Sequence, residues 1–186
     1  RKIYGLDEIP TLLRGTLRRA GFCQSWDVFV QLGMTDDSFV MDLPEGFTTR
    51  MFINSFLPYD EVRSLETKIK ELLPWVTDEI LEKVAWLGLF EENELPLRKG
   101  SPAAIFQVIL EEKWKLQSAD KDMIVMQHLF EIETPQGIKK LTSSLVCKGE
   151  NQTYTAMAKT VGLPLAMAVD LFLEGRIKVK GLHTPI

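Results

Sequence analysis

The sequence predicts an α+β fold, because helix-type and strand-type periodicities occupy separate blocks of its 186 residues. Apolar residues recur at spacings of three and four through the middle third, which indicates helices. The last third contains a run rich in strand-forming residues, and an alternating segment stands near the amino end. A chain of this length can form one domain, or one and a fraction, with a substantial core.

The first expected element is a strand over residues 11–18, with the sequence TLLRGTLR. Alternation along a strand would place Arg14, Thr16 and Arg18 on one face. A helix there would put a glycine unfavourably in its interior. The next residues, 21–33, carry an apolar stripe at helical spacing, so a helix and then a connector are expected to follow.

Three helices are expected in the middle third, each beginning at a residue whose side-chain oxygen can accept an amide hydrogen bond. The first has an apolar stripe starting at Val62, and Pro74 is expected to stop it. The expected caps are Asp60, Thr77 and Ser101, the last followed by Pro102. The middle third is therefore predicted to be a small helical subdomain.

The last third is expected to begin with a β-hairpin. Residues 123–133, MIVMQHLFEIE, are mostly apolar on both faces, as in a strand covered on both sides. The turn sequence TPQG then leads into a second strand over 138–147. A helix over 154–174, interrupted near Pro164, and a short strand over 177–179 complete the prediction.

Charge and composition argue against several classes of protein. Lys and Arg number 22 against 26 Asp and Glu, a net charge of −4, which argues against nucleic-acid binding. No uninterrupted apolar run approaches about 18 residues, so no membrane partner is expected. The two cysteines, Cys23 and Cys147, are far apart, which fits structural thiols in a reducing compartment.

The sequence contains no motif of a self-contained active site. Neither GxGxxG nor GxxxxGK[ST] occurs, so a phosphate cradle is not predicted. His128 and His183 lack metal-ligand spacing, and no metal site is expected; His128, inside an apolar strand, is predicted to be packed and hydrogen-bonded. The serines lie in no nucleophile motif, so no catalytic residue is assigned.

The arginines of RGTLRR are the remaining candidates for a functional role. Arginine matches a carboxylate with a planar fork of donors, and a strand would hold two such forks on one face. The functional hypothesis is a site for a ligand with more than one carboxylate. Ordinary surface or interdomain ion pairs are the alternative, and residue chemistry leaves both open.

Four segments in series resemble the saccharopine dehydrogenase family. They are RGTLRRAGF at 14–22, AWLGLF at 85–90, DKDMIVMQHLFEIE at 120–133 and TAMAKTVGLPLAMAVDLFLEG at 155–175. In more detail they look like the glutamate-forming saccharopine reductases of the aminoadipate pathway and the matching half of the bifunctional lysine-degrading enzyme. The resemblance covers nearly the whole chain in the same order.

The resemblance implies a three-part parent protein. A Rossmann domain would bind NAD or NADP, a mixed-sheet domain would bind saccharopine, and a small helical domain would be inserted into the sheet domain. This chain would supply much of the sheet domain, which would be incomplete, in residues 1–36 and 119–186, and the helical insertion in residues 37–118. The Rossmann domain, absent from the sequence, would be its partner, so the fragment is expected to bind no cofactor and to be inactive alone.

The resemblance also implies substrate-binding residues. The family's saccharopine-binding segment matches Thr16, Leu17 and Arg18, and Arg14 is a supporting candidate on the same predicted face. The implied substrates are saccharopine and glutamate, in an oxidoreductase of lysine biosynthesis or degradation. Whether the cofactor is NAD or NADP is not decided by these residues.

Two other functions stay open. One is a reductase of another amino-acid imine, such as a carboxynorspermidine-type enzyme, and the other is a non-catalytic oligomerisation module. A homodimer through the alanine- and methionine-rich helix from Thr155 is also left open. The cytoplasm is the expected compartment, with the mitochondrial matrix as the alternative.

Overall fold

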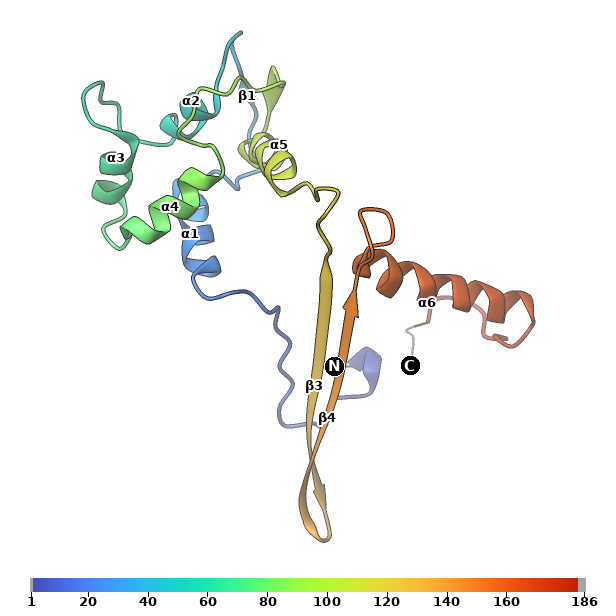
Figure 1. Ribbon diagram of the computed structural model, residues 1–186. Coiled ribbons are helices and arrows are strands. Elements are labelled where there is room, and N and C mark those ends of the chain that lie inside the picture. The colour runs from blue at the N-terminus through green and yellow to red at the C-terminus, as the bar shows by residue number, and fades with distance from the viewer. Residues whose placement is uncertain (1, 184–186) are drawn as a thin grey trace. The chain divides into compact units, whose positions relative to one another are not determined.

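The computed structural model describes residues 2–183, and it confirms the α+β class (Figure 1). The chain forms two compact units. One, here called the helical unit, comprises residues 13–115. The other, called the hairpin unit, joins residues 1–12 to residues 116–186.

The helical unit contains five α-helices and one small antiparallel strand pair among its described residues. The helices are α1 (Phe22–Leu32), α2 (Thr49–Asn54), α3 (Leu65–Leu72), α4 (Asp78–Trp86) and α5 (Pro102–Trp114). Strands β1 (Met41–Asp42) and β2 (Lys99–Gly100) pair in antiparallel register, Met41 opposite Gly100. The helix predicted over 21–33 is confirmed, and Gly33, at a φ of +84°, ends it.

Short polar side chains begin four of these helices. Thr77 and Ser101 accept amide hydrogen bonds from Ile80 and Ala104, as predicted, and Pro102 occupies the first turn of α5. The prediction for α3 was wrong in its cap: Ser64, not Asp60, begins the helix. Asp60 instead accepts bonds from backbone amides within the preceding turn, which leaves Val62 almost fully exposed.

A single hydrophobic core lies between the helices of this unit. Its largest fully buried side chains come from helices α1 to α5 and from the segments between them. They include Phe52, Met34, Ile53, Ile69, Leu89 and Ile105. α1 contributes Val28 and Phe29 to the same core, so α1, which the predicted division placed in the sheet domain, packs here with the helical unit. The division of the parent into domains stays a prediction.

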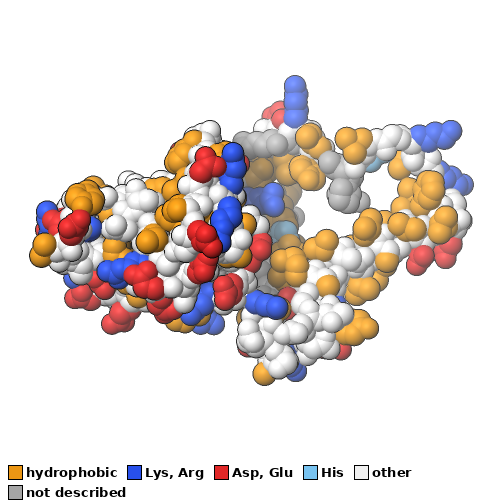
Figure 2. All heavy atoms as spheres, turned by 90° about the horizontal axis from the view of Figure 1, so that it is seen from above, with side chains coloured by type: hydrophobic (Ala, Val, Ile, Leu, Met, Phe, Trp, Pro, Cys, Tyr) orange, Lys and Arg blue, Asp and Glu red, His pale blue; other side chains and the backbone are white. Residues whose placement is uncertain are grey.

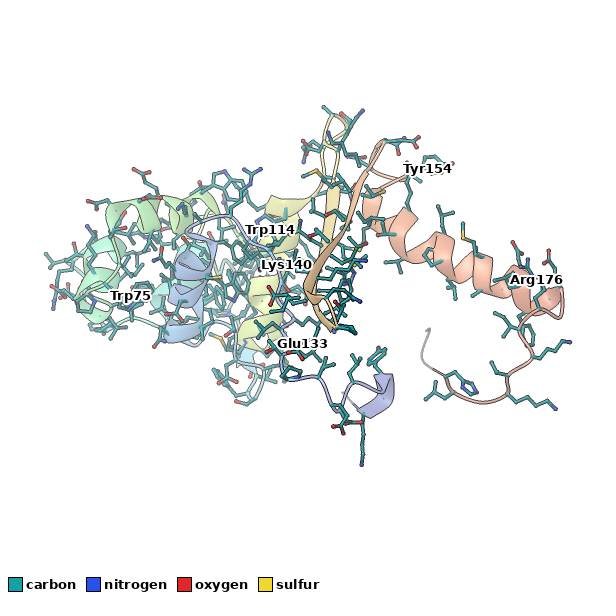
Figure 3. The ribbon with its side chains drawn as sticks, turned by 90° about the horizontal axis from the view of Figure 1, so that it is seen from below. Trp75, Trp114, Glu133, Lys140, Tyr154 and Arg176 are labelled. Atoms are coloured by element: carbon teal, nitrogen blue, oxygen red, sulfur yellow. The ribbon has the colours of Figure 1, made fainter. Side chains whose placement is uncertain are left out.

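The hairpin unit is built on two long antiparallel strands, β3 (Met123–Thr134) and β4 (Gly137–Lys148). Their register is continuous from the pair Met123 and Lys148 to the pair Thr134 and Gly137, and it confirms the predicted hairpin. A short 3₁₀ helix, η1 (Lys2–Tyr4), belongs to the same unit. Side chains stand on both faces of the strands, with Glu133 and Lys140 near the turn (Figure 3).

Within the described residues of the hairpin unit, 2–12 and 116–183, the predicted cover on both faces of the hairpin is not found. Leu129 is 72% exposed on one face, while Met126, Phe130 and Leu141 are exposed on the other. His128 lies on that second face, exposed and beside the Phe130 ring, so the packed environment predicted for it is not found. The hairpin therefore presents two apolar faces to its surroundings.

Helix α6 (Ala156–Leu173) follows the hairpin and runs without interruption through Pro164. The expected break was wrong, because a solvent-exposed helix can leave the one carbonyl that loses its amide partner to water. Gly175, at a φ of +71°, follows its end as predicted. The short strand predicted over 177–179 is not formed; those residues are irregular.

α6 is unusually apolar for its exposure. Its 18 residues have a mean hydropathy of 1.5, enough by length and composition to cross a membrane, although only 6% of the helix is buried. A helix was predicted here, but its high mean hydropathy was not, because Lys159 and Asp170 interrupt the apolar run. Exposed apolar side chains are frequent on α6, whereas charges of both signs are seen on the face of the helical unit in Figure 2.

Candidate functional site

The segment that carries the candidate arginines, residues 11–19, is irregular and exposed along its whole length. The strand predicted there was wrong. A strand needs a neighbouring strand for its backbone hydrogen bonds, and within residues 2–183 only β1 with β2 and β3 with β4 form strand pairs. The segment leads from η1 to α1 without regular secondary structure (Figure 1).

The described arginines of this segment differ from those in the rest of the chain in their ion pairs. The arginines outside it each pair with a carboxylate, at Arg50–Glu92, Arg63–Asp60, Arg98–Glu94 and Arg176–Glu174. Within residues 2–183, Arg14, Arg18 and Arg19 have no such partner. Within residues 2–183 these three guanidinium groups are therefore available to anions, and ion pairs with another domain of the parent stay open as the alternative.

Of the three arginines, Arg18 has the contacts that orient its side chain. Its Nη1 donates a hydrogen bond of 2.9 Å to the carbonyl oxygen of Leu17, and its guanidinium carbon is 5.2 Å from the centroid of the Phe22 ring. A cation over an aromatic face at this distance is attracted by the ring. The contact fixes one side of the guanidinium and leaves most of its five donors unused.

Gly21 makes this contact possible. Its φ is +83°, a left-handed value that other residues adopt only with strain, and it turns the chain immediately before α1. The Phe22 amide donates to the Arg19 carbonyl at 3.1 Å within the same turn. As a result Arg18, which lies outside the helix, comes to lie beside a ring in the helix's first turn.

The other predicted residues lie next to Arg18 along the chain but have fewer contacts. Leu17 accepts the Arg18 hydrogen bond through its backbone, and its side chain is 75% exposed. In the described part of the chain the side chains of Thr16 and Arg14 make no hydrogen bond or ion pair. The structure thus places all four candidates in one exposed segment and orients only Arg18.

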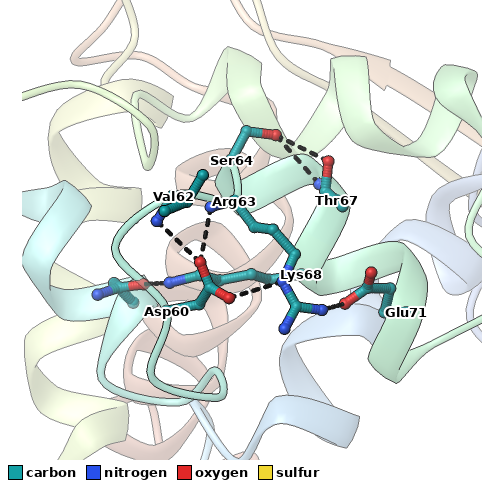
Figure 4. Close-up of polar contacts among 8 residues, drawn as sticks. Asp60, Val62, Arg63, Ser64, Thr67, Lys68 and Glu71 are labelled. Atoms are coloured by element: carbon teal, nitrogen blue, oxygen red, sulfur yellow. Dashed lines mark hydrogen bonds and ion pairs between the residues drawn. The ribbon is translucent and has the colours of Figure 1, made fainter.

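A second cluster of polar groups, around Asp60, has a structural role (Figure 4). Backbone amides of Arg63 and Val62, together with the Arg63 guanidinium, lower the pKa of Asp60 to about 2. Arg63 also pairs with Glu71, which ties this turn to α3. Lys68 is 3% exposed and donates to the Asn54 side chain at 3.0 Å, joining α3 to α2. These contacts satisfy one another and hold the loop after α2.

Other candidate features lie apart from the arginine segment. A hollow beside α2, α4 and α5 is lined by Thr49, Leu87, Glu91 and Lys113 among others, and no residue of 11–19 lines it. Cys23 and Cys147 are free thiols, and His183 contacts the Lys180 carbonyl. Residues 2–183 contain no group of three or more metal-binding side chains.

The amino terminus of α6 does not fit the phosphates of a dinucleotide cofactor. Such cofactors place their phosphates where a parallel strand leads through glycines into a helix amino terminus. Here α6 follows an antiparallel strand, and a carboxylate already occupies its amino terminus. Asp122 accepts from the amides of Ala156 and Met157 at 2.6 and 2.9 Å, which also lowers the pKa of Asp122. A phosphate there would be repelled by this carboxylate.

The signal that the sequence analysis missed is the aromatic support of Arg18. Phe22 was predicted only as part of the apolar stripe of a helix. An arginine four residues before an aromatic residue, with a glycine between them, could have indicated the contact. The pattern RRAGF contains all three residues.

A comparison with families of known proteins matches the whole chain to one family. The profile described as the saccharopine dehydrogenase C-terminal domain matches residues 1–186. This agrees with the resemblance seen in the four sequence segments.

Individual relatives are similar over almost the entire chain. The chain is 36% identical over 191 residues to rat (Rattus norvegicus) alpha-aminoadipic semialdehyde synthase, mitochondrial, covering 99% of this chain and 20% of the relative. It is 34% identical over 200 residues to saccharopine dehydrogenase [NADP(+), L-glutamate-forming] of Saccharomyces cerevisiae, covering 100% of this chain and 43% of the relative. The chain thus spans about a fifth of the first relative's length and about two fifths of the second's.

Proposed function

The chain belongs to the saccharopine dehydrogenase C-terminal domain family, and from this premise we propose that it forms the substrate-binding part of a saccharopine dehydrogenase. The parent would be an NADP- or NAD-dependent, L-glutamate-forming oxidoreductase of lysine metabolism. The fragment alone would bind no dinucleotide and would be inactive. Its task would be to hold saccharopine, or the glutamate released from it.

The observation that carries this proposal is the row of arginines without carboxylate partners in residues 14–19. The exposed arginines elsewhere in the described chain form ion pairs with carboxylates of the protein itself. Saccharopine bears three carboxylates, so it offers the anions that these guanidinium groups lack. A charge-assisted, two-pronged contact from Arg18 to one carboxylate would give both affinity and orientation.

The neighbouring residues would complete the contact. The Thr16 hydroxyl can donate to a carboxylate oxygen, and the backbone of Leu17 already holds the Arg18 side chain. Arg14 would be a supporting cation for a second carboxylate. None of these groups needs to act as an acid, base or nucleophile, since their role is to bind and orient the substrate.

The exposed apolar faces support the proposal that other parts of the parent cover this chain. α6 buries only Ala156, and the hairpin exposes apolar side chains on both faces. A nucleotide-binding domain, and a second copy of the parent, are the proposed covers. The name of the rat relative places that protein in mitochondria, which supports the mitochondrial matrix beside the cytoplasm as a compartment.

The test uses the complete parent protein with Arg18→Ala. Saccharopine-dependent reduction of NADP and NAD is followed by absorbance. We expect turnover by the native protein and a rise of about 100-fold in the KM for saccharopine in the variant, since each charged hydrogen bond lost costs about 1.5–3 kcal/mol. Arg98→Ala is the matched control, because it removes an exposed arginine that pairs with Glu94 of the same unit.

Each result that contradicts the proposal would favour a different function or a different binding residue. A folded parent that binds the dinucleotide but does not oxidise saccharopine would reject this substrate and favour another amino-acid imine. A folded parent that binds no dinucleotide would favour a non-catalytic oligomerisation module. Equal effects of Arg18→Ala and Arg98→Ala would remove Arg18 from the site.

A further inference from the structure

Arg18 lies at the outer end of a row of aromatic side chains. Its guanidinium carbon is 5.2 Å from the centroid of the Phe22 ring. The Phe22 ring stacks on Trp26, with centroids 6.0 Å and planes 7° apart. Trp26 stacks in turn on Trp114 at the end of α5, at 6.2 Å and 30°. The row joins an exposed cation on a connecting segment to the helices α1 and α5.

The inner part of this row is fixed by the hydrophobic core. Trp26 packs edge-on against Phe29 at 5.7 Å and lies 5.8 Å from Phe106. Phe29 and Phe106 are 3% and 2% exposed and have their centroids 4.7 Å apart. Because close-packed core side chains change rotamer with difficulty, Trp26 is a rigid support. Phe22, 36% exposed, is the link between this support and the surface.

The chemistry of the guanidinium makes the contact useful to a binding site. Its flat faces are attracted to aromatic rings, whereas its N–H donors point outward in the plane. A carboxylate approaches in that plane, so the ring and the carboxylate do not compete for the same part of Arg18. One donor of Arg18 is taken by the Leu17 carbonyl, and the remaining donors can meet a ligand.

We propose that Phe22 is a positioning residue for the substrate, which acts by holding the Arg18 guanidinium in place before a carboxylate arrives. Trp26 supports Phe22 in this role. The inference rests on the proposed function, because it requires Arg18 to bind a substrate carboxylate. A long, flexible arginine loses side-chain freedom when it binds, and a ring that restricts it beforehand reduces that cost.

The test measures the KM for saccharopine and kcat in the complete parent with Phe22→Leu and Phe22→Tyr. Leucine keeps an apolar side chain but removes the ring face, so the KM for saccharopine is expected to rise about 3- to 30-fold. Tyrosine retains a ring and is expected to keep most of the affinity. The KM for the dinucleotide is expected to stay unchanged in both variants.

A double substitution distinguishes positioning from a merely structural role. If Phe22 acts through Arg18, then Phe22→Leu adds little further loss in an Arg18→Ala background. Trp86→Leu is the matched control, since it removes the other cation–ring contact of the helical unit, in which the Lys113 ammonium is 5.0 Å from the Trp86 centroid. That control is expected to leave the KM for saccharopine unchanged.

The outcomes separate this inference from the proposed function. A large effect of Arg18→Ala with none from Phe22→Leu overturns the positioning role alone. The same holds if Phe22→Leu is equally harmful with and without Arg18, or if tyrosine fails to rescue. No effect of Arg18→Ala, or no turnover of saccharopine, overturns both. Should Phe22→Leu fail to fold, Phe22→Met, which also lacks a ring, is measured against the same expectations.

Discussion

The helical unit and the hairpin unit contain similar apolar residues but bury them very differently. Among residues 2–183, every buried apolar side chain except Ala156 belongs to the helical unit. The hairpin unit leaves most of α6 and both faces of β3 and β4 exposed. A long two-stranded hairpin with one helix cannot enclose a core, whereas five short helices can.

This difference shows which unit is stabilised by contacts among its own residues. The helical unit has a closed core, capped helices and polar clusters whose members satisfy one another. The hairpin unit has the apolar surface of a core without the second layer that would complete it. The described residues of the hairpin unit therefore do not by themselves bury its apolar surface.

The largest effect is expected from removing a buried ring of the helical unit, in contrast to an exposed ring of the hairpin unit. Phe52 is fully buried and packs edge-on against Phe56 at 5.2 Å, so Phe52→Ala should lower the free energy of unfolding of the helical unit by about 3–5 kcal/mol. Phe172, 62% exposed on α6, should change the stability of chain 1–186 by less than about 0.5 kcal/mol when replaced by alanine. Urea unfolding read by hydrogen exchange in each unit measures both changes.

The complete parent sharpens this comparison. If other parts of the parent cover α6, Phe172→Ala should cost about 1–3 kcal/mol there, although it costs little in the isolated chain. An unchanged small cost in the parent would show that α6 remains exposed. A large cost already in chain 1–186 would show that the hairpin unit has a core of its own.

A smaller effect is expected from the carboxylate that joins β3 to α6. Asp122→Ala should expose the Ala156 and Met157 amides and make them exchange several-fold faster, because their acceptor is lost. Thr155 still accepts from the Ala158 amide, so the rest of α6 should persist. Exchange followed by NMR measures this locally.

Asp170→Ala is the matched control in the same helix. A carboxylate near a helix carboxyl end gains nothing from the helix dipole, so this change should not accelerate exchange in the first turn. Equal acceleration by both variants would show that α6 frays as a whole and that Asp122 does not anchor it.

The elements that the sequence predicted well depend on local chemistry. Thr77 and Ser101 were identified as caps because a hydroxyl meets amides only three residues away. The hairpin was identified from two strand-forming runs joined by a turn. The strand over 11–18 failed because alternation defines faces but not a pairing partner, and Asp60 failed because Ser64, four residues later, has the same cap chemistry.

The candidate site likewise has features that follow from local sequence and features that depend on tertiary structure. That Arg18 lies in a cationic segment follows from the sequence alone, whereas its contact with Phe22 depends on the left-handed turn at Gly21. The absence of carboxylate partners for these arginines, within residues 2–183, also required the positions of all the acidic side chains. Sequence patterns therefore located the segment, and tertiary structure showed which of its residues is oriented.

The smallest expected effects are on the pH dependence of stability. One carboxylate from each unit, Asp60 and Asp122, is compared. Backbone amides lower the pKa of Asp60, to about 2, and also lower that of Asp122. A carboxyl group whose folded pKa lies below the unfolded value of about 3.9 stabilises the fold above that value. For Asp60 this contribution is lost as the pH falls from about 4 to about 2. NMR titration of the two carboxyl carbons measures both shifts directly.

The substitution Arg63→Met tests how much of the lowered Asp60 pKa in the helical unit is due to backbone amides and how much to the Arg63 side chain. The Arg63 guanidinium is lost, but the amides of residues 62 and 63 still donate to Asp60, so its pKa should rise only part of the way to the ordinary value. The pKa of Asp122, held by amides of α6, should not move. Complete recovery of the Asp60 pKa would mean that the turn opens without Arg63. The loop after α2 would then depend on that single side chain.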